Sequence, residues 1–159
     1  MKIFISHQQA DAAIAAQVAR RLQSAHGIES YLDVIDPYVN GSAESLAEHI
    51  RTEMGKCTQL LAVISYATLA SQWVPWEVGV ATEKNFPLAT YTGTYTSPPE
   101  FLQKWPYLKN EADLDAYARA SFAARNFRDV YKNYSADTVA GGRAATSYFF
   151  TELRRSIGQ

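Results

Sequence analysis

The chain has 159 residues, of which 47% are hydrophobic and 13% aromatic, and this favours one folded domain over a disordered chain. Its formal net charge of −1 gives no reason to expect nucleic acid or an anionic membrane surface as a partner. A single cysteine, Cys57, excludes an internal disulfide and fits a reducing compartment, and we interpret it as a packed residue rather than a nucleophile. The sequence shows neither a signal peptide nor a membrane-spanning run, so we expect a cytoplasmic protein.

The predicted elements alternate between strand and helix along the chain. Predicted strands cover residues 2–5, 28–34, 60–64, 86–91 and 105–108. The first predicted helix is capped by Asp11 and ends at Gly27. Further helices are predicted over 42–54, after 60–64 with Pro75 in its first turn, and over 111–125 and 144–156. Between the last two we expect only helical turns, around Val130.

This alternation predicts a doubly wound α/β fold, a five-stranded parallel sheet with helices on both faces and a helical extension at the carboxyl end. Residues 28–34 alternate like a half-exposed edge strand, whereas 60–64 are continuously apolar like a central one, which gives the strand order 2-1-3-4-5. Ligands of such sheets bind at the carboxyl ends of the strands, where the winding reverses. We therefore expect Ser6-His7 and the segment from Ser65 to Glu77 to border one crevice between the first and third strands.

The segment 71-SQWVPWEVGVATEK-84 places one acid, Glu77, behind two tryptophans at the start of a helix. Pro75 suits a first helical turn, so Glu77 is expected in that turn or just after it, near free backbone N–H groups. A carboxylate in an aromatic cleft can stabilise or attack the cationic sugar carbon that forms as an N-glycosidic bond breaks, while Trp73 stacks on a flat ring. Acids and tryptophans at helix starts are also common for stability alone, and residue chemistry by itself favours that structural interpretation.

The histidines give weaker signals. His7 can be a general base, a substrate donor or a structural histidine, and the structural role is the default. His26 and His49 are spaced like surface residues of helices, so no metal site is predicted. The sequence contains no Gly-rich dinucleotide fingerprint and no GxxxxGK[ST] phosphate loop.

Taken in order, the segments 3-IFISH-7, 32-LDVIDPYVNG-41, 60-LLAVIS-65 and 71-SQWVPWE-77 resemble the motifs of TIR domains, particularly the bacterial ones. The last is similar to the family's Ser-x-Trp-x-x-x-Glu pattern, although Val74 stands where family members often have Cys. We therefore treat 1–159 as a single TIR-like domain, with a motif-bearing core at 1–91 and a variable last strand and helices at 92–159.

The resemblance implies a flavodoxin-like sheet and, as in many bacterial members, cleavage of NAD+ between ribose and nicotinamide. By motif, Glu77 takes the catalytic position, and the loop with Asp33, Asp36 and Tyr38 is one that often gates the site. The residues implied to bind substrate are Ile5, Ser6, His7, Asp33, Asp36, Tyr38 and Trp73. NAD+ would be the substrate, and neither a cofactor nor a metal is expected.

Compact members of this kind resemble the TIR proteins of Thoeris anti-phage systems, which convert NAD+ into a cyclised or modified ADP-ribose messenger. That implies a homo-oligomer and a separate effector protein activated by the product, with no nucleic acid or membrane partner. Two alternatives stay open. One is a non-catalytic TIR adaptor that self-associates through the loop 35–41, for which Glu77 is dispensable. The other is a nucleoside deoxyribosyltransferase-like enzyme, which uses a carboxylate on a related sheet and acts on nucleosides without a diphosphate.

Overall fold

A computed structural model of the protein describes residues 1–32, 43–93, 97–134 and 138–159. Within these residues, five parallel strands form one sheet in the order β2-β1-β3-β4-β5, which confirms the predicted topology. The strands are β1 (Lys2–Ser6), β2 (Glu29–Leu32), β3 (Gln59–Val63), β4 (Leu88–Tyr91) and β5 (Tyr107–Leu108).

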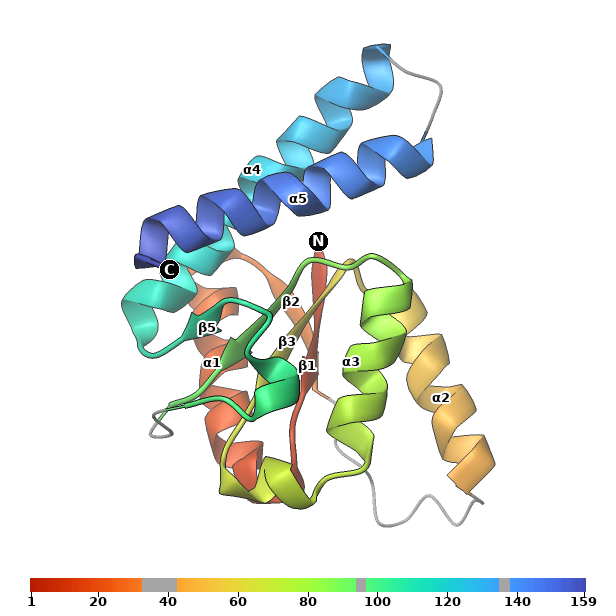
Figure 1. The fold of residues 1–159 in the computed structure, drawn as a ribbon, viewed down its shortest axis with the longest axis vertical. Coiled ribbons are helices and arrows are strands. Elements are labelled where there is room, and N and C mark those ends of the chain that lie inside the picture. Colours follow the sequence, from red (N-terminus) through yellow and green to blue (C-terminus); the bar gives the residue numbers. More distant parts are fainter. Residues whose placement is uncertain (33–42, 94–96, 135–137) are drawn as a thin grey trace.

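Helices cover both faces of this sheet (Figure 1). The helices are α1 (Ala12–His26), α2 (Ala43–Gly55), α3 (Trp73–Glu83), α4 (Glu111–Tyr134) and α5 (Thr138–Ile157), and the short 3-10 turns are η1 (Gln9–Asp11), η2 (Tyr66–Ala70) and η3 (Glu100–Leu102). In Figure 1, α2 and α3 lie together beside the sheet, while α4 and α5 form a pair that extends beyond it. No helix in the described ranges is long and apolar enough to cross a membrane.

The core consists of two apolar layers, one on each face of the sheet. Ile3 and Ile5 of β1 pack into the layer shared with α1, α4 and α5, whereas Phe4 packs into the layer shared with α2 and α3. Because side chains alternate along a strand, Ser6 points to the same face as Phe4. The end of β1 therefore directs a polar side chain toward α3.

The predictions for the second strand and for Cys57 are confirmed. The strand β2 is an edge strand with Glu29 exposed, so it is the half-exposed strand that the alternation indicated. Cys57 is 5% exposed just before β3, and its Sγ donates to the carbonyl oxygen of Glu53 at 3.5 Å. Burial raises the pKa of the Cys57 thiol to about 11, so it is a packed, protonated thiol at neutral pH.

The carboxyl-terminal helices are longer than the sequence predicts. Helix α4 continues to Tyr134 instead of ending near residue 125, and α5 begins at Thr138 instead of near residue 144. The two glycines at 141 and 142 argue against a helix by propensity, because glycine is the poorest helix former after proline. Tertiary packing reverses that preference: a Cβ at Gly141 would lie 2.8 Å from Cδ1 of Tyr131, so glycine allows the two helices to approach closely.

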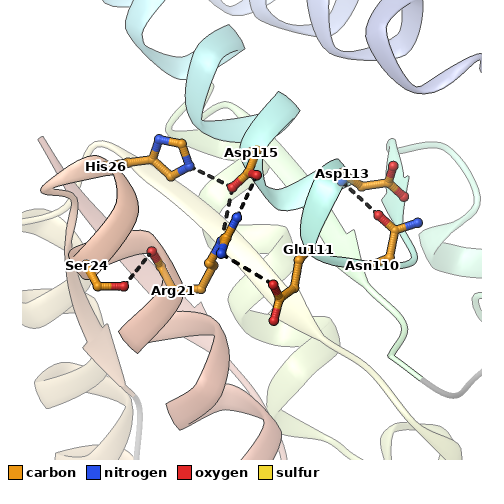
Figure 2. Close-up of polar contacts among 7 residues, drawn as sticks. All are labelled: Arg21, Ser24, His26, Asn110, Glu111, Asp113 and Asp115. Atoms are coloured by element: carbon orange, nitrogen blue, oxygen red, sulfur yellow. Dashed lines mark hydrogen bonds and ion pairs between the residues drawn. The ribbon is translucent and has the colours of Figure 1, made fainter.

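An ion-pair network joins α1 to α4 (Figure 2). Asp115 accepts hydrogen bonds from Arg21 Nε at 3.2 Å and Nη2 at 2.8 Å, and its Oδ1 lies 2.8 Å from His26 Nε2. The guanidinium of Arg21, followed by the imidazole of His26, lowers the pKa of the Asp115 carboxyl from 3.8 to about 2. This corrects the expectation for His26, which is a half-buried partner in the network rather than a plain surface residue. His49 is exposed, as predicted, and lies 3.2 Å from the hydroxyl of Tyr31.

Candidate functional site

The centre of the candidate site is a contact between Ser6, the last residue of β1, and Glu77 on α3. Ser6 Oγ donates a hydrogen bond to Glu77 Oε2, and the two residues are 0% and 1% exposed. The strand order places β1 beside β3, and the connection from β3 leads into α3, so the two side chains meet although they lie far apart in the sequence. The contact therefore lies at the carboxyl end of β1, where the winding of the sheet reverses. The hydroxyl donor offsets part of the cost of burying the carboxylate.

Glu77 lies in the second turn of α3, just after the first turn, which is one of the two positions that the sequence predicts. The helix begins at Trp73, and the Oγ of Ser71 accepts a hydrogen bond from the backbone N–H of Val74 at 3.1 Å. Pro75 is thus the third helical residue, where its missing N–H leaves no helical hydrogen bond unmade. Glu77 is the fifth, past the free N–H groups of the helix start, and the hydroxyl of Ser6 donates a hydrogen bond to it.

The two tryptophans of the motif lie on the same helix as this carboxylate. Trp73 is half-buried, and its ring meets that of Trp76 edge-on, with 5.6 Å between the centroids and 89° between the planes. Both pack against the apolar layer under α2 and α3, as predicted for Trp76. Trp73 and Glu77 are four residues apart and so share one face of the helix. The exposed part of the Trp73 ring is available to a flat ligand ring.

His7 and Ile5 contribute in different ways. His7 is 5% exposed, and its Nδ1 lies 3.2 Å from the carbonyl oxygen of Ile5. Because a carbonyl oxygen only accepts, Nδ1 is the donor in this contact. The side chain of Ile5 is fully buried on the opposite face of the sheet. Ile5 can therefore line a ligand site only through its backbone.

A second polar contact at this end of the sheet was missed by the sequence analysis. Ser65, just after β3, donates from its Oγ to Asp11 Oδ2 at 2.9 Å, and its Oγ also accepts from the N–H of Ala67 at 3.1 Å. Asp11 is 4% exposed and makes no side-chain cap, so the predicted capping role is wrong. The signal that could have found Ser65 is a serine at the carboxyl end of each central strand: Ser6 ends β1, and Ser65 lies two residues past β3.

The remaining predicted site residues, Asp33, Asp36 and Tyr38, lie outside the described residues. Among the residues that the structure describes, no group of three or more His, Cys, Asp or Glu side chains is placed to hold a metal ion.

The strand order makes this a flavodoxin-like α/β protein, with a buried carboxylate at the switch point of its parallel sheet. The sequence profile of the TIR domain family matches residues 3–122, which is more than half of the chain, and the protein therefore belongs to this family. The match contains β2 to β5 and all of β1 except Lys2, includes both Ser6 and Glu77, and ends within α4. A search of curated proteins gave no match to the chain.

Proposed function

We propose that the protein cleaves NAD+ between nicotinamide and ribose, with Glu77 as the catalytic carboxylate. The observation that supports this most is the position of Glu77: a buried carboxylate at the switch point of the sheet, held by Ser6 and on the same helix face as Trp73. TIR domains include NAD+ hydrolases as well as adaptors, and an adaptor needs no carboxylate at this position for chemistry.

The proposed reaction breaks the bond between C1′ of the ribose and the pyridinium nitrogen. The electron pair of that bond moves to the ring nitrogen, so neutral nicotinamide leaves and positive charge develops on C1′ and the ribose ring oxygen. A carboxylate in a water-poor site stabilises that charge, and Trp73 stacks on the departing ring. Water then adds to C1′ and loses a proton, which gives ADP-ribose, or a nucleophile in the adenosine part adds instead, which gives a cyclic product.

Substrate access requires movement around the carboxylate. Glu77 is 1% exposed and Ser6 is fully buried, so NAD+ reaches them only after neighbouring side chains shift. The proposed substrate residues are Ser6, His7, Trp73, Asp33, Asp36 and Tyr38, together with the backbone of Ile5. Resemblance to Thoeris TIR proteins extends the proposal to a homo-oligomer whose product activates a separate effector in anti-phage immunity.

The test is nicotinamide release from NAD+ by the purified protein, compared with Glu77→Gln and with Glu83→Gln as the matched control. Glu83 is an exposed acid on the same helix, so Glu83→Gln changes the net charge by the same amount as Glu77→Gln. We expect release to fall at least ~100-fold in Glu77→Gln, as for loss of a charge-stabilising group, and to stay unchanged in Glu83→Gln. A product lighter than ADP-ribose by one water would identify cyclisation. Release that survives in Glu77→Gln would contradict the assignment.

The adaptor is the second candidate, and an exposed apolar surface favours it. The Ser6–Glu77 hydrogen bond ties β1 to α3, so it is also compatible with a purely structural role. The turn η2, which follows β3, exposes Tyr66 by 76% and Leu69 by 58%, and these side chains form an apolar surface at the carboxyl end of the sheet. An adaptor would release no nicotinamide at any protein concentration, and Leu69→Ser would weaken its self-association. The loop 35–41 of the adaptor hypothesis lies outside the described residues.

A further inference from the structure

A pocket of about 620 Å³ lies at the other end of the sheet from Ser6 and Glu77. Its walls come from the residues that precede β3 and β4, including Thr58 and Pro87, and from the facing sides of α4 and α5. Figure 1 shows these two helices next to the end of the sheet where the chain begins. A volume of this size falls within the range of small-molecule sites in proteins, roughly 300–1,000 Å³.

The pocket is strongly cationic although the protein is not. Its lining holds four cationic side chains, Lys84, Arg125, Arg128 and Arg143, against one carboxylate, Glu83. The whole chain has a net charge of −1, so this excess is local. The one ion pair recorded here within the described residues is weak, with 3.9 Å between Arg125 Nε and Asp129 Oδ2. Charges gathered around a concave surface attract and orient an anion.

Surface arginines often extend into water with no ligand, but two buried polar groups in this pocket do not fit that explanation. Gln59 is 2% exposed and lines the pocket; its Oε1 lies 3.0 Å from Ser121 Oγ, and its Nε2 has no hydrogen-bond partner within the described part of the chain. Arg128 also lines the pocket, and its Nε is buried with no partner among the same residues. Because buried polar groups are nearly always paired, we interpret these two unpaired groups as positions where a ligand atom binds.

We propose that this pocket binds a small organic phosphate of nucleotide size. Arginine guanidinium groups match phosphate oxygens in geometry and charge, and this assigns the phosphate to Arg125, Arg128 and Arg143. The unpaired end of the Gln59 amide binds an uncharged polar atom, such as a sugar hydroxyl or a base edge, because an amide carries no charge to pair with a phosphate. The ring of Phe86 supplies apolar lining. All three arginines lie beyond the segment that matches the TIR family.

The test measures ADP binding by calorimetry to the wild-type chain, to Arg125→Ala/Arg143→Ala, and to Arg119→Ala as the matched control. Arg119 is an exposed arginine of α4 that does not line the pocket. We expect the double variant to bind ADP at least about tenfold more weakly, because two charge-assisted contacts are lost, and Arg119→Ala to bind like the wild type. Both substituted arginines of the double variant are exposed, so the fold is retained and circular dichroism verifies this.

Ligand probes separate the pocket from the crevice at Glu77 and test the size of the ligand. Adenosine, which lacks the phosphates, should bind at least about tenfold more weakly than ADP, and so should inorganic phosphate. Trp73→Ala, on the other side of the protein, should leave the affinity for ADP unchanged. The proposal is overturned by an absence of ADP binding, by equal binding in the double variant, or by binding that is lost in Trp73→Ala and kept in the double variant. It is independent of whether Glu77 is catalytic.

Discussion

Removal of the Ser6 hydroxyl should destabilise the protein, and more so while residue 77 carries a charge. Ser6 and Glu77 are 0% and 1% exposed, so the hydrogen bond between them is shielded from water. Hydrogen bonds to charged groups contribute about 1.5–3 kcal/mol and neutral ones about 1 kcal/mol. We therefore expect Ser6→Ala to lower the free energy of unfolding by about 2 kcal/mol in the wild-type background and by about 1 kcal/mol in the Glu77→Gln background.

The assay is urea unfolding followed by tryptophan fluorescence at pH 7 for the two single variants and the double variant. With a denaturant slope of about 2 kcal/mol per molar, Ser6→Ala should lower the urea midpoint by about 1 M. The coupling between the two sites should be about 1 kcal/mol. Ser24→Ala is the control, because Ser24 is exposed and its contact with the carbonyl oxygen of Arg21 is 3.5 Å long; it should change stability by less than about 0.5 kcal/mol. Equal losses in both backgrounds would refute the contact between Ser6 and an ionised Glu77.

Two further predictions concern the helices around the sheet. Gly141→Ala should lower the free energy of unfolding by about 1–3 kcal/mol, because its Cβ would meet the ring of Tyr131 at 2.8 Å. Gly142→Ala has open space around its Cβ and should raise the free energy of unfolding by up to about 1 kcal/mol. Thermal unfolding compares the two variants, and equal effects would contradict the close approach of α4 and α5. Asp115 has its pKa lowered from 3.8 to about 2, so it binds fewer protons when folded; its stabilising contribution is present above about pH 4 and is lost as the pH falls toward 2. Asp115→Asn should remove that part of the acid dependence in urea titrations between pH 2 and 5, and an unchanged slope would argue against the network with Arg21.

Much of the fold could be predicted because its signals are short-range. The apolar run 60–64 marks a central strand, the alternation at 28–34 an edge strand, and Gly27, at a φ of 64° after α1, ends the helix where glycine is favoured. These features depend on residues a few positions apart, so a linear sequence carries them. The strand order then follows from which strands must be buried on both faces.

The candidate site could be predicted only in part. The motif around Glu77 indicates the acid and the strand ends indicate where it lies, but the donor that holds it, Ser6, lies in another segment. Asp11 is a second example of a partner that the local sequence does not reveal. Its local pattern predicts a helix cap, but its carboxylate instead accepts a hydrogen bond from Ser65, which is distant in the sequence. Local patterns cannot weigh such competing partners.

What the sequence by itself determined is therefore the alternation of elements, their order in the sheet and the acid at its switch point. Only the tertiary structure decided that α5 begins before its glycines, that Ser6 donates to Glu77, and that Arg125 and Arg143 face one pocket with Gln59. The physical reason is the same in each case. Burial and long-range partners determine which of several locally acceptable conformations has the lowest free energy, and they exist only once the chain has folded.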